Sequence, residues 1–139
     1  MPEGDGPPAS ASSTARIEIV RTTLGKVLAD GRGHTLYMLS SDKRSRSTCF
    51  GACAHAWPPL TTNAKPRAST DVTSSKLATI SRGKGVRQVT YDGHPLYGFI
   101  KDTGPRQTHG QGIVAFGGKW SALTSSGKSP AHSGSSNGY

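Results

Sequence analysis

The chain has 139 residues, of which 32% are hydrophobic, 18 are glycine and 9 are proline. This length suits one domain, and so many turn-forming residues among so few apolar ones favour short strands over long helices. A formal charge of +9 indicates acidic partners, and no stretch is apolar enough over a sufficient length for a membrane span.

Both ends of the chain carry almost no large apolar side chains, so they bury too little surface to offset the entropy of ordering them. We predict a disordered tether over residues 1–15, one β-rich domain over 16–124 and a disordered tail over 125–139. The leader is typical of the tether of a surface protein. It predicts an extracytoplasmic location, secreted or at the cell surface, although the given sequence begins without the apolar segment of an export signal.

Four strands and one helical turn are expected from local patterns. The strands cover, in chain order, residues 16–20, 26–29, 86–91 and 118–124. The segment 48–57 predicts one or two helical turns, which end before Pro58 and Pro59 because proline cannot continue a helix. The predicted fold class is therefore all-β and mainly antiparallel.

An internal repeat is the best-defined feature of the sequence. Residues 27–60 and 89–123 both contain Asp-Gly, then His-x-Leu-Tyr, an Asp five places after the Tyr, and a later Trp-x-x-Leu. The matched pairs are Asp30 with Asp92, His34 with His94, Leu36 with Leu96, Tyr37 with Tyr97, Leu39 with Phe99, Asp42 with Asp102, Trp57 with Trp120 and Leu60 with Leu123. We predict a small duplicated domain of two pseudo-symmetric hairpin repeats, at about 24–60 and 86–123, with a helical turn near Cys49–Trp57 that breaks the symmetry.

The strand that follows each Asp-Gly turn is expected to separate its side chains by alternation. In the first repeat, Tyr37 and Leu39 should point to one face of the sheet, and Leu36 and Met38 to the other. The repeat predicts the same arrangement around Tyr97 in the second unit.

The paired acids and tryptophans of the repeats each allow two interpretations. Asp42 and Asp102 follow the point where apolar alternation stops, so we expect them to accept hydrogen bonds from loop N–H groups or from a hydroxyl of the other repeat. The alternative is a hydrolase whose two carboxyl groups face each other within about 10 Å across an open cleft. Trp57 and Trp120 are expected in the core, the alternative being an exposed platform for stacking a ligand.

Cys49 and Cys53 are the only cysteines, spaced Cys-x-x-x-Cys. On a helical turn this spacing places both side chains on one face within disulfide range, and an extracytoplasmic location favours the oxidised form. The alternative is a soft-metal or redox site, with copper as the candidate metal, that uses Cys49, Cys53 and His55. In this alternative His34, His94 and Met38 approach the site in space. If the disulfide forms, no cofactor is predicted.

Basic residues occur in several loops rather than on one helix. They are Lys43, Arg44, Arg46, Lys65, Arg67, Arg82, Lys84, Arg87, Lys101 and Arg106. This spread predicts a solvated surface that attracts anionic envelope polymers or lipid headgroups. Specific nucleic-acid binding is not expected, because no helix-turn-helix, zinc-finger or aromatic-basic pattern accompanies the charge, and no protein partner is indicated.

Four segments carry a family resemblance: YMLSSD (Tyr37–Asp42), CFGACAHAWPPL (Cys49–Leu60), YGFIKD (Tyr97–Asp102) and QGIVAFGGKW (Gln111–Trp120). Over roughly residues 24–124 the chain resembles the family of secreted lipoprotein repeats with a Y-x-[FWY]-x-x-D motif. It departs from the family at Leu39, where the motif has an aromatic residue, and in lacking a lipobox cysteine, so lipid anchoring does not carry over. The resemblance implies an envelope location. It does not imply any particular activity, because the family is described as uncharacterised.

Together these features predict a non-catalytic, secreted or cell-surface structural or interaction module of unknown ligand. The first alternative is an extracytoplasmic metal-binding or redox protein using Cys49, Cys53 and His55. The second is a hydrolase using Asp42 and Asp102. Phosphate-loop, dinucleotide-binding and G-x-S-x-G motifs are absent from the sequence.

Overall fold

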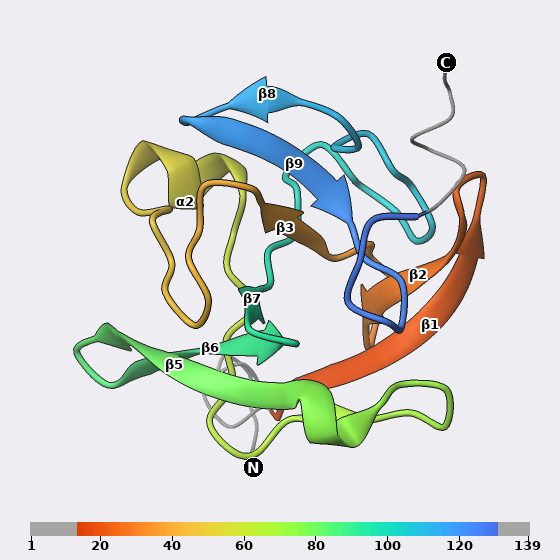
Figure 1. The fold of residues 1–139 in the computed structure, drawn as a ribbon, viewed down its shortest axis with the longest axis horizontal. Coiled ribbons are helices and arrows are strands. Elements are labelled where there is room, and N and C mark those ends of the chain that lie inside the picture. Colours follow the sequence, from red (N-terminus) through yellow and green to blue (C-terminus); the bar gives the residue numbers. More distant parts are fainter. Residues whose placement is uncertain (1–13, 131–139) are drawn as a thin grey trace, which may run out of the picture.

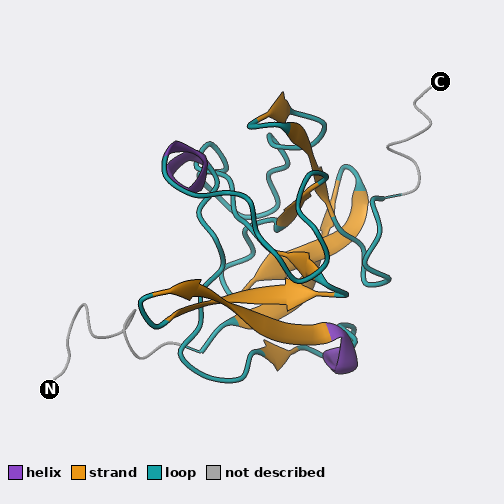
Figure 2. Cartoon of the chain, turned by 60° about the vertical axis from the view of Figure 1, so that its left-hand side comes forward, coloured by secondary structure: helices purple, strands orange, loops and turns teal. Residues whose placement is uncertain are grey.

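The computed structural model describes residues 14–130, which form short strands connected by turns and loops (Figure 1). The elements in chain order are β1 (Arg16–Thr22), β2 (Gly25–Asp30), β3 (Tyr37–Leu39), α2 (Ala52–Ala56), β4 (Arg67–Ala68), η1 (Ser74–Lys76), β5 (Leu77–Gly83), β6 (Val86–Tyr91), β7 (His94–Pro95), β8 (Val114–Ala115) and β9 (Gly118–Ala122). Figure 2 shows the two short helices at the periphery of the strands. The predicted all-β class with one short helical turn is confirmed.

The strands of the described region form three small sheets, in the orders β2-β1-β4, β3-β9-β8 and β5-β6-β7. All pairings within them are antiparallel except the short parallel pairing of β1 with β4. The four strands expected from the sequence correspond to β1, β2, β6 and β9. The sequence did not predict β5, because its segment LATISRG carries few apolar residues and is at most half-buried.

The hairpin β1–β2 in the first repeat has its counterpart in the hairpin β5–β6 of the second. The N–H of Leu36 donates to the carbonyl of Leu28 at 3.0 Å, and the N–H of Leu96 donates to the carbonyl of Val89 at 3.1 Å. These matching bonds make Leu28 and Val89 structural equivalents. Each repeat therefore begins one strand earlier than the motifs alone indicate.

The turn that follows these hairpins differs between the repeats. In the second repeat, Asp92 and Gly93 form the turn with positive φ angles of 52° and 83°, the left-handed geometry of two-residue hairpin turns. In the first repeat, the N–H of Asp30 donates to the carbonyl of His34, so residues 31–33 form a longer loop. Asp30 therefore lies in the strand, and its predicted equivalence with Asp92 is wrong by one position.

Each repeat ends in a segment that pairs with the other repeat. The N–H of Leu28 donates to the carbonyl of Leu123 at 2.8 Å, and the N–H of Val89 donates to the carbonyl of Leu60 at 2.8 Å. In the same way β9 pairs with β3, while Pro59 forms an isolated bridge with the second repeat. The final segments are thus exchanged, and neither repeat completes its own backbone hydrogen bonds.

The buried core divides into two clusters, and each draws side chains from both repeats. One contains Ile17, Leu28, Leu36, Val72, Val89, Tyr91, Leu96 and Leu123, with Ala15 at its edge. The other contains Val27, Tyr37, Leu39, Cys49, Cys53, Trp57, Tyr97, Trp120 and Ala122. Tyr37 and Leu39 point into the second cluster, whereas Leu36 and Met38 face the first, as alternation predicted. The hydrophobic driving force for folding is therefore shared between the repeats.

Packing extends slightly beyond the predicted domain at both ends. The buried Ala15 donates its N–H to Thr62 Oγ1 at 3.0 Å, and the Tyr91 hydroxyl donates to the carbonyl of Ser125 at 2.6 Å. Pro130 is also buried. Residues 1–13 of the predicted tether and 131–139 of the predicted tail lie outside the described residues.

Candidate functional site

The motif tyrosines and aspartates form hydrogen bonds that cross between the repeats. The Tyr37 hydroxyl donates to Asp102 Oδ2 at 2.5 Å, and the Tyr97 hydroxyl donates to Asp42 Oδ2 at 2.6 Å. The two tyrosines also exchange backbone N–H···O bonds of 2.7 and 3.0 Å. They therefore lie side by side at the pseudo-symmetric centre of the fold.

Both carboxylates have further donors in the loops that follow them. Asp102 Oδ1 accepts the N–H of His109 at 3.0 Å, and Asp42 Oδ1 accepts the N–H and the hydroxyl of Thr48 at 2.8 and 2.7 Å. Asp102 is only 4% exposed. A hydrolytic pair needs carboxyl groups available to substrate and water, so these bonds count against the hydrolase hypothesis.

The environment of the two tyrosines shifts their titration. Burial raises the pKa of both Tyr37 and Tyr97 well above the usual value, because the phenolate would lose its hydration. The hydrogen bond from each hydroxyl to its aspartate raises the pKa further. Both hydroxyls therefore stay protonated as donors at neutral pH.

The tryptophans of the two repeats stack on each other inside the fold. The rings of Trp57 and Trp120 lie 3.8 Å apart and nearly parallel, and Phe99 stacks on the other side of Trp57 at 4.0 Å. Tyr37 meets Trp57 edge to face at 5.5 Å, and Tyr97 meets Trp120 in the same way at 5.1 Å. Because the two tryptophans are at most 1% exposed, they do not form a surface platform for a ligand.

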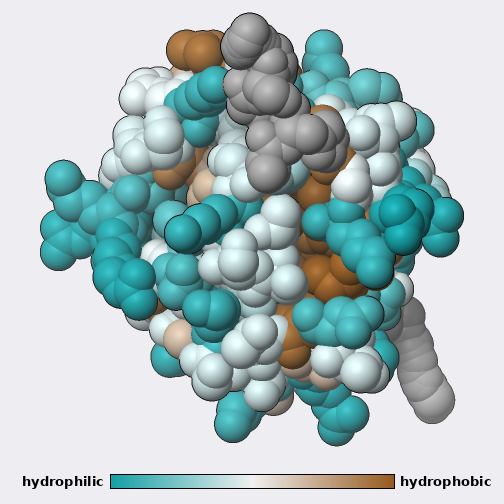
Figure 3. Space-filling model, turned by 45° about the vertical axis from the view of Figure 1, so that its right-hand side comes forward, coloured by the Kyte–Doolittle hydropathy of each residue, from teal (hydrophilic) through white to brown (hydrophobic). Residues whose placement is uncertain are grey.

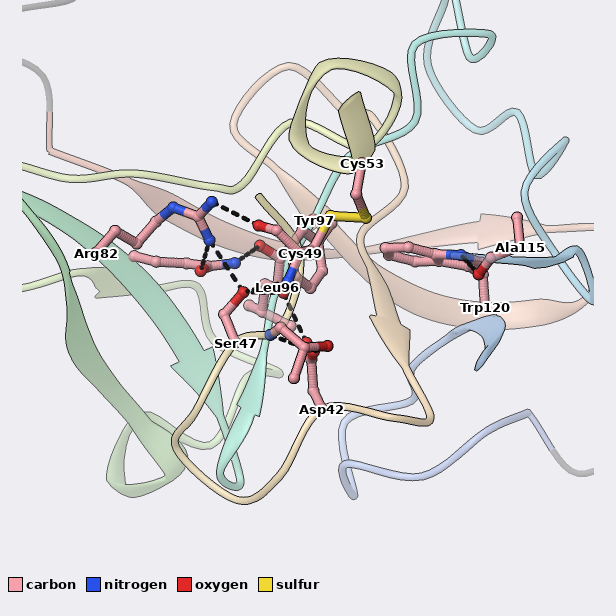
Figure 4. The surroundings of a disulfide bond; sticks show 11 residues. Asp42, Ser47, Cys49, Cys53, Arg82, Leu96, Tyr97, Ala115 and Trp120 are labelled. Carbon is pink, nitrogen blue, oxygen red and sulfur yellow. Dashed lines mark hydrogen bonds between the residues drawn. A yellow bond between two sulfur atoms is a disulfide. The ribbon is translucent and has the colours of Figure 1, made fainter. Parts of the chain in front are cut away.

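The expected disulfide between Cys49 and Cys53 is present at the start of α2 (Figure 4). Cys49 is fully buried and Cys53 is 6% exposed, and both pack in the cluster that holds the stacked tryptophans. With its sulfur atoms bonded to each other, the pair offers no thiolate for a metal. The disulfide fixes a short segment that has no counterpart in the second repeat.

Arg82 connects the disulfide segment to β5. It is therefore not the solvated loop residue that the sequence predicted. Its guanidinium donates to Ser47 Oγ at 3.0 Å, to Gln88 Oε1 at 2.9 Å and to the carbonyl of Cys49 at 2.6 Å (Figure 4). Ser47 Oγ in turn hydrogen-bonds the Tyr97 hydroxyl at 2.5 Å. The sequence signal for this contact was Gln88, a polar residue in a strand that otherwise alternates regularly. A polar side chain needs a hydrogen-bond partner when it is buried.

The candidate metal ligands do not gather at one place. His55 is exposed on α2, while His34 and His94 line separate hollows on either side of the pseudo-symmetric centre. Within residues 14–130, no three His, Cys, Asp or Glu side chains are grouped to hold a metal ion. The metal or redox hypothesis stays a prediction that a thiol and metal assay must test.

The basic loop at 43–48 is attached to the β5-β6-β7 sheet at the turn between β6 and β7. The N–H of Ser45 donates to the carbonyl of Gly93 at 2.7 Å, and Arg44 Nη1 donates to the carbonyl of Asp92 at 3.1 Å. Arg82 holds the other end of this loop through Ser47. We call the surface formed by Lys43, Arg44, Arg46 and Arg82 the basic edge.

An exposed aromatic ring adjoins the basic edge. Phe50 is 52% exposed, and the Arg82 guanidinium carbon lies 4.2 Å above its ring centre. This cation–π contact leaves the other side of the ring available to solvent or a ligand. Arg87 does not belong to the edge, because its guanidinium bonds Thr79 Oγ1 at 3.0 Å.

The fold and these contacts define a duplicated, disulfide-containing β-module with a basic edge. The chain belongs to the family Lipoprotein_15, described as a secreted repeat of unknown function, whose family model matches residues 18–61 and 78–124. The two matches include β1 and β5, in agreement with the structural repeats. No curated protein and no solved structure matches the chain. In the described region, no helix has the length and apolar character needed to cross a membrane.

The crossed tyrosines should make the protein sensitive to alkaline pH. Their folded pKa is raised above the unfolded value near 10, so their stabilisation is complete below about pH 10 and is lost as the pH rises. Above about pH 10, each tyrosine should lower the free energy of unfolding by about 1.4 kcal/mol per pH unit. Tyr37→Phe should halve the contribution of the two tyrosines to this pH dependence. At neutral pH the same variant should lose about 1.5–3 kcal/mol of unfolding free energy, because it removes a hydrogen-bond donor to Asp102.

Urea unfolding of the parent chain, Y37F, Y97F and the double variant at a series of pH values measures both effects. An unchanged slope above about pH 10 in the double variant would show that these hydroxyls are not the alkaline-sensitive groups.

Removing the disulfide should cost less unfolding free energy than is usual for a disulfide, because this one closes a very short loop. The C49S/C53S variant is expected to lose about 2 kcal/mol of unfolding free energy, measured by urea unfolding. In the parent chain, thiol labelling should detect no free thiol until both denaturant and reductant are present. Reactive thiols without reductant, or a stoichiometric metal found by elemental analysis, would instead support the metal or redox alternative.

Proposed function

We propose that the protein is a non-catalytic, extracytoplasmic binding module that holds an anionic polymer of the cell envelope on its basic edge. Its membership of a secreted repeat family supports the location. The excess of Lys and Arg over Asp and Glu, 17 against 8, supports an anionic partner. Both motif carboxylates are occupied by internal hydrogen bonds, which supports a role without catalysis.

The observation that carries this proposal is the attachment of the loop at 43–48 to the β5–β7 sheet. Its bonds from Ser45 to Gly93 and from Arg82 to Ser47 hold cations from two distant parts of the sequence on one edge. Because that loop is tied at both ends, binding a ligand there costs less ordering entropy than it would on a free loop.

Within residues 14–130, the cations of the basic edge form no ion pair with the acids beside them. Asp42 accepts three hydrogen bonds from Tyr97 and Thr48, and Asp92 pairs with Lys76 at 3.6 Å. Lys43, Arg44 and Arg46 are exposed. A polymer with regularly spaced phosphate or carboxylate groups can engage several of these cations at once, and a sugar ring of that polymer can pack on Phe50.

Heparin–agarose chromatography, with heparin as the polyanion probe, tests the basic edge. The variant K43Q/R44Q/R46Q should elute at distinctly lower salt than the parent chain, because each lost contact to the polyanion weakens binding and its salt dependence. A triple variant outside the basic edge, R21Q/K26Q/K101Q, provides the matched control. Figure 1 shows the β1–β2 turn at the far side from the β5–β6 turn.

Both triple variants remove three of the 17 basic residues, so a non-specific charge effect would shift their elution equally. The proposal requires a clearly larger shift for the basic-edge variant, with circular dichroism showing that both variants remain folded. Equal shifts, or binding only to vesicles of phosphatidylglycerol and not to heparin, would contradict it.

A further inference from the structure

A hollow of about 630 Å³ lies between the two repeats. We call it the Met38 hollow; its lining includes Met38, Leu39, Asp42, His94, Lys119 and Pro130. The size falls within the range of sites for small molecules. In Figure 3, one face of the molecule shows a narrow recess of hydrophobic side chains between hydrophilic ones, so apolar surface is accessible on this fold.

A second, smaller hollow of about 330 Å³ occupies the pseudo-equivalent place. It is lined by His34 and Asp102, as the Met38 hollow is lined by His94 and Asp42. Each hollow therefore combines the histidine of one repeat with the aspartate of the other. The second hollow supplies an internal control for the first, because it repeats the same motif residues in half the volume.

The floor and the rim of the Met38 hollow differ in chemistry. The half-buried Met38 supplies most of the apolar surface, because Leu39 is only 3% exposed, and a thioether adapts readily to flexible alkyl ligands. At the rim, the side chains of Lys119 and His94 have no hydrogen-bond or ion-pair partner within residues 14–130. Asp42 is the acid of this lining, and its oxygens already accept three hydrogen bonds.

We propose that the Met38 hollow binds an amphiphile with one alkyl chain and an anionic head group. The alkyl chain would cover the exposed surface of Met38, gaining the free energy of apolar burial. The anionic head would pair with Lys119, and a hydrogen bond to His94 would orient it. This inference goes beyond the proposed function and does not depend on it, since neither Lys119 nor His94 belongs to the basic edge.

Titration with octanoate, followed by amide chemical shifts in two-dimensional NMR, tests the proposal on the full chain. Octanoate should produce saturable shifts at Met38, Leu39 and Lys119 and leave His34 unaffected. Octanol, which has the same chain without the charge, should bind at the same place about tenfold more weakly. Octylammonium, with the opposite charge, should bind more weakly still.

Two variants separate the head-group contact from the integrity of the hollow. Lys119→Gln should reduce octanoate affinity to that of octanol while leaving octanol affinity unchanged, which also shows that the hollow persists. His94→Gln should weaken octanoate binding, whereas His34→Gln, the matched change in the smaller hollow, should not. Absence of saturable shifts, shifts centred on the smaller hollow, or equal octanoate affinity in K119Q and the parent chain would overturn the proposal.

Discussion

The exchange of hydrogen bonds between the repeats is the constraint on which the rest of this structure depends. Tyr37 and Tyr97 pair through their backbones and each reaches the aspartate of the other repeat. The final segments of the repeats cross over in the same way, and both core clusters contain side chains from both halves. A repeat taken alone would leave buried donors and acceptors unpaired, which is costly in an apolar interior. Duplication is therefore a requirement of this fold and not only a feature of its history.

This frame also explains where the two halves are free to differ. The crossed hydrogen bonds and the stacked tryptophans need the same residue types in both repeats, so these positions carry stability. The disulfide segment and the contacts that Arg82 of the second repeat makes with it have no pseudo-symmetric counterpart. They hold the loop at 43–48 against the neighbouring sheet, so the cations of this loop lie on a fixed surface. The binding role proposed for the protein thus lies in the parts that break the pseudo-symmetry.

Local pattern accounts for much of the fold, but not for the long-range contacts that build the site. Alternation correctly assigned the faces of Tyr37 and Leu39, because the side-chain period of a strand is fixed at two. It missed β5, whose residues are too polar to show that period. The attachment of Arg82 to the disulfide segment joins residues more than thirty positions apart, and no local spacing encodes it. For the same reason, the basic residues appeared scattered along the sequence although the fold brings Arg82 to the loop at 43–48.

Native-state amide hydrogen exchange in increasing urea tests most directly whether the repeats form one cooperative unit. The amides of Leu28 and Val89 are the informative probes, because each donates to the exchanged segment of the other repeat. The interlocked fold predicts that both exchange through one opening, with the same free energy and the same dependence on urea. If either amide exchanged through a lower-energy opening with a weaker urea dependence, one repeat would unfold independently and the interlocking account would be contradicted.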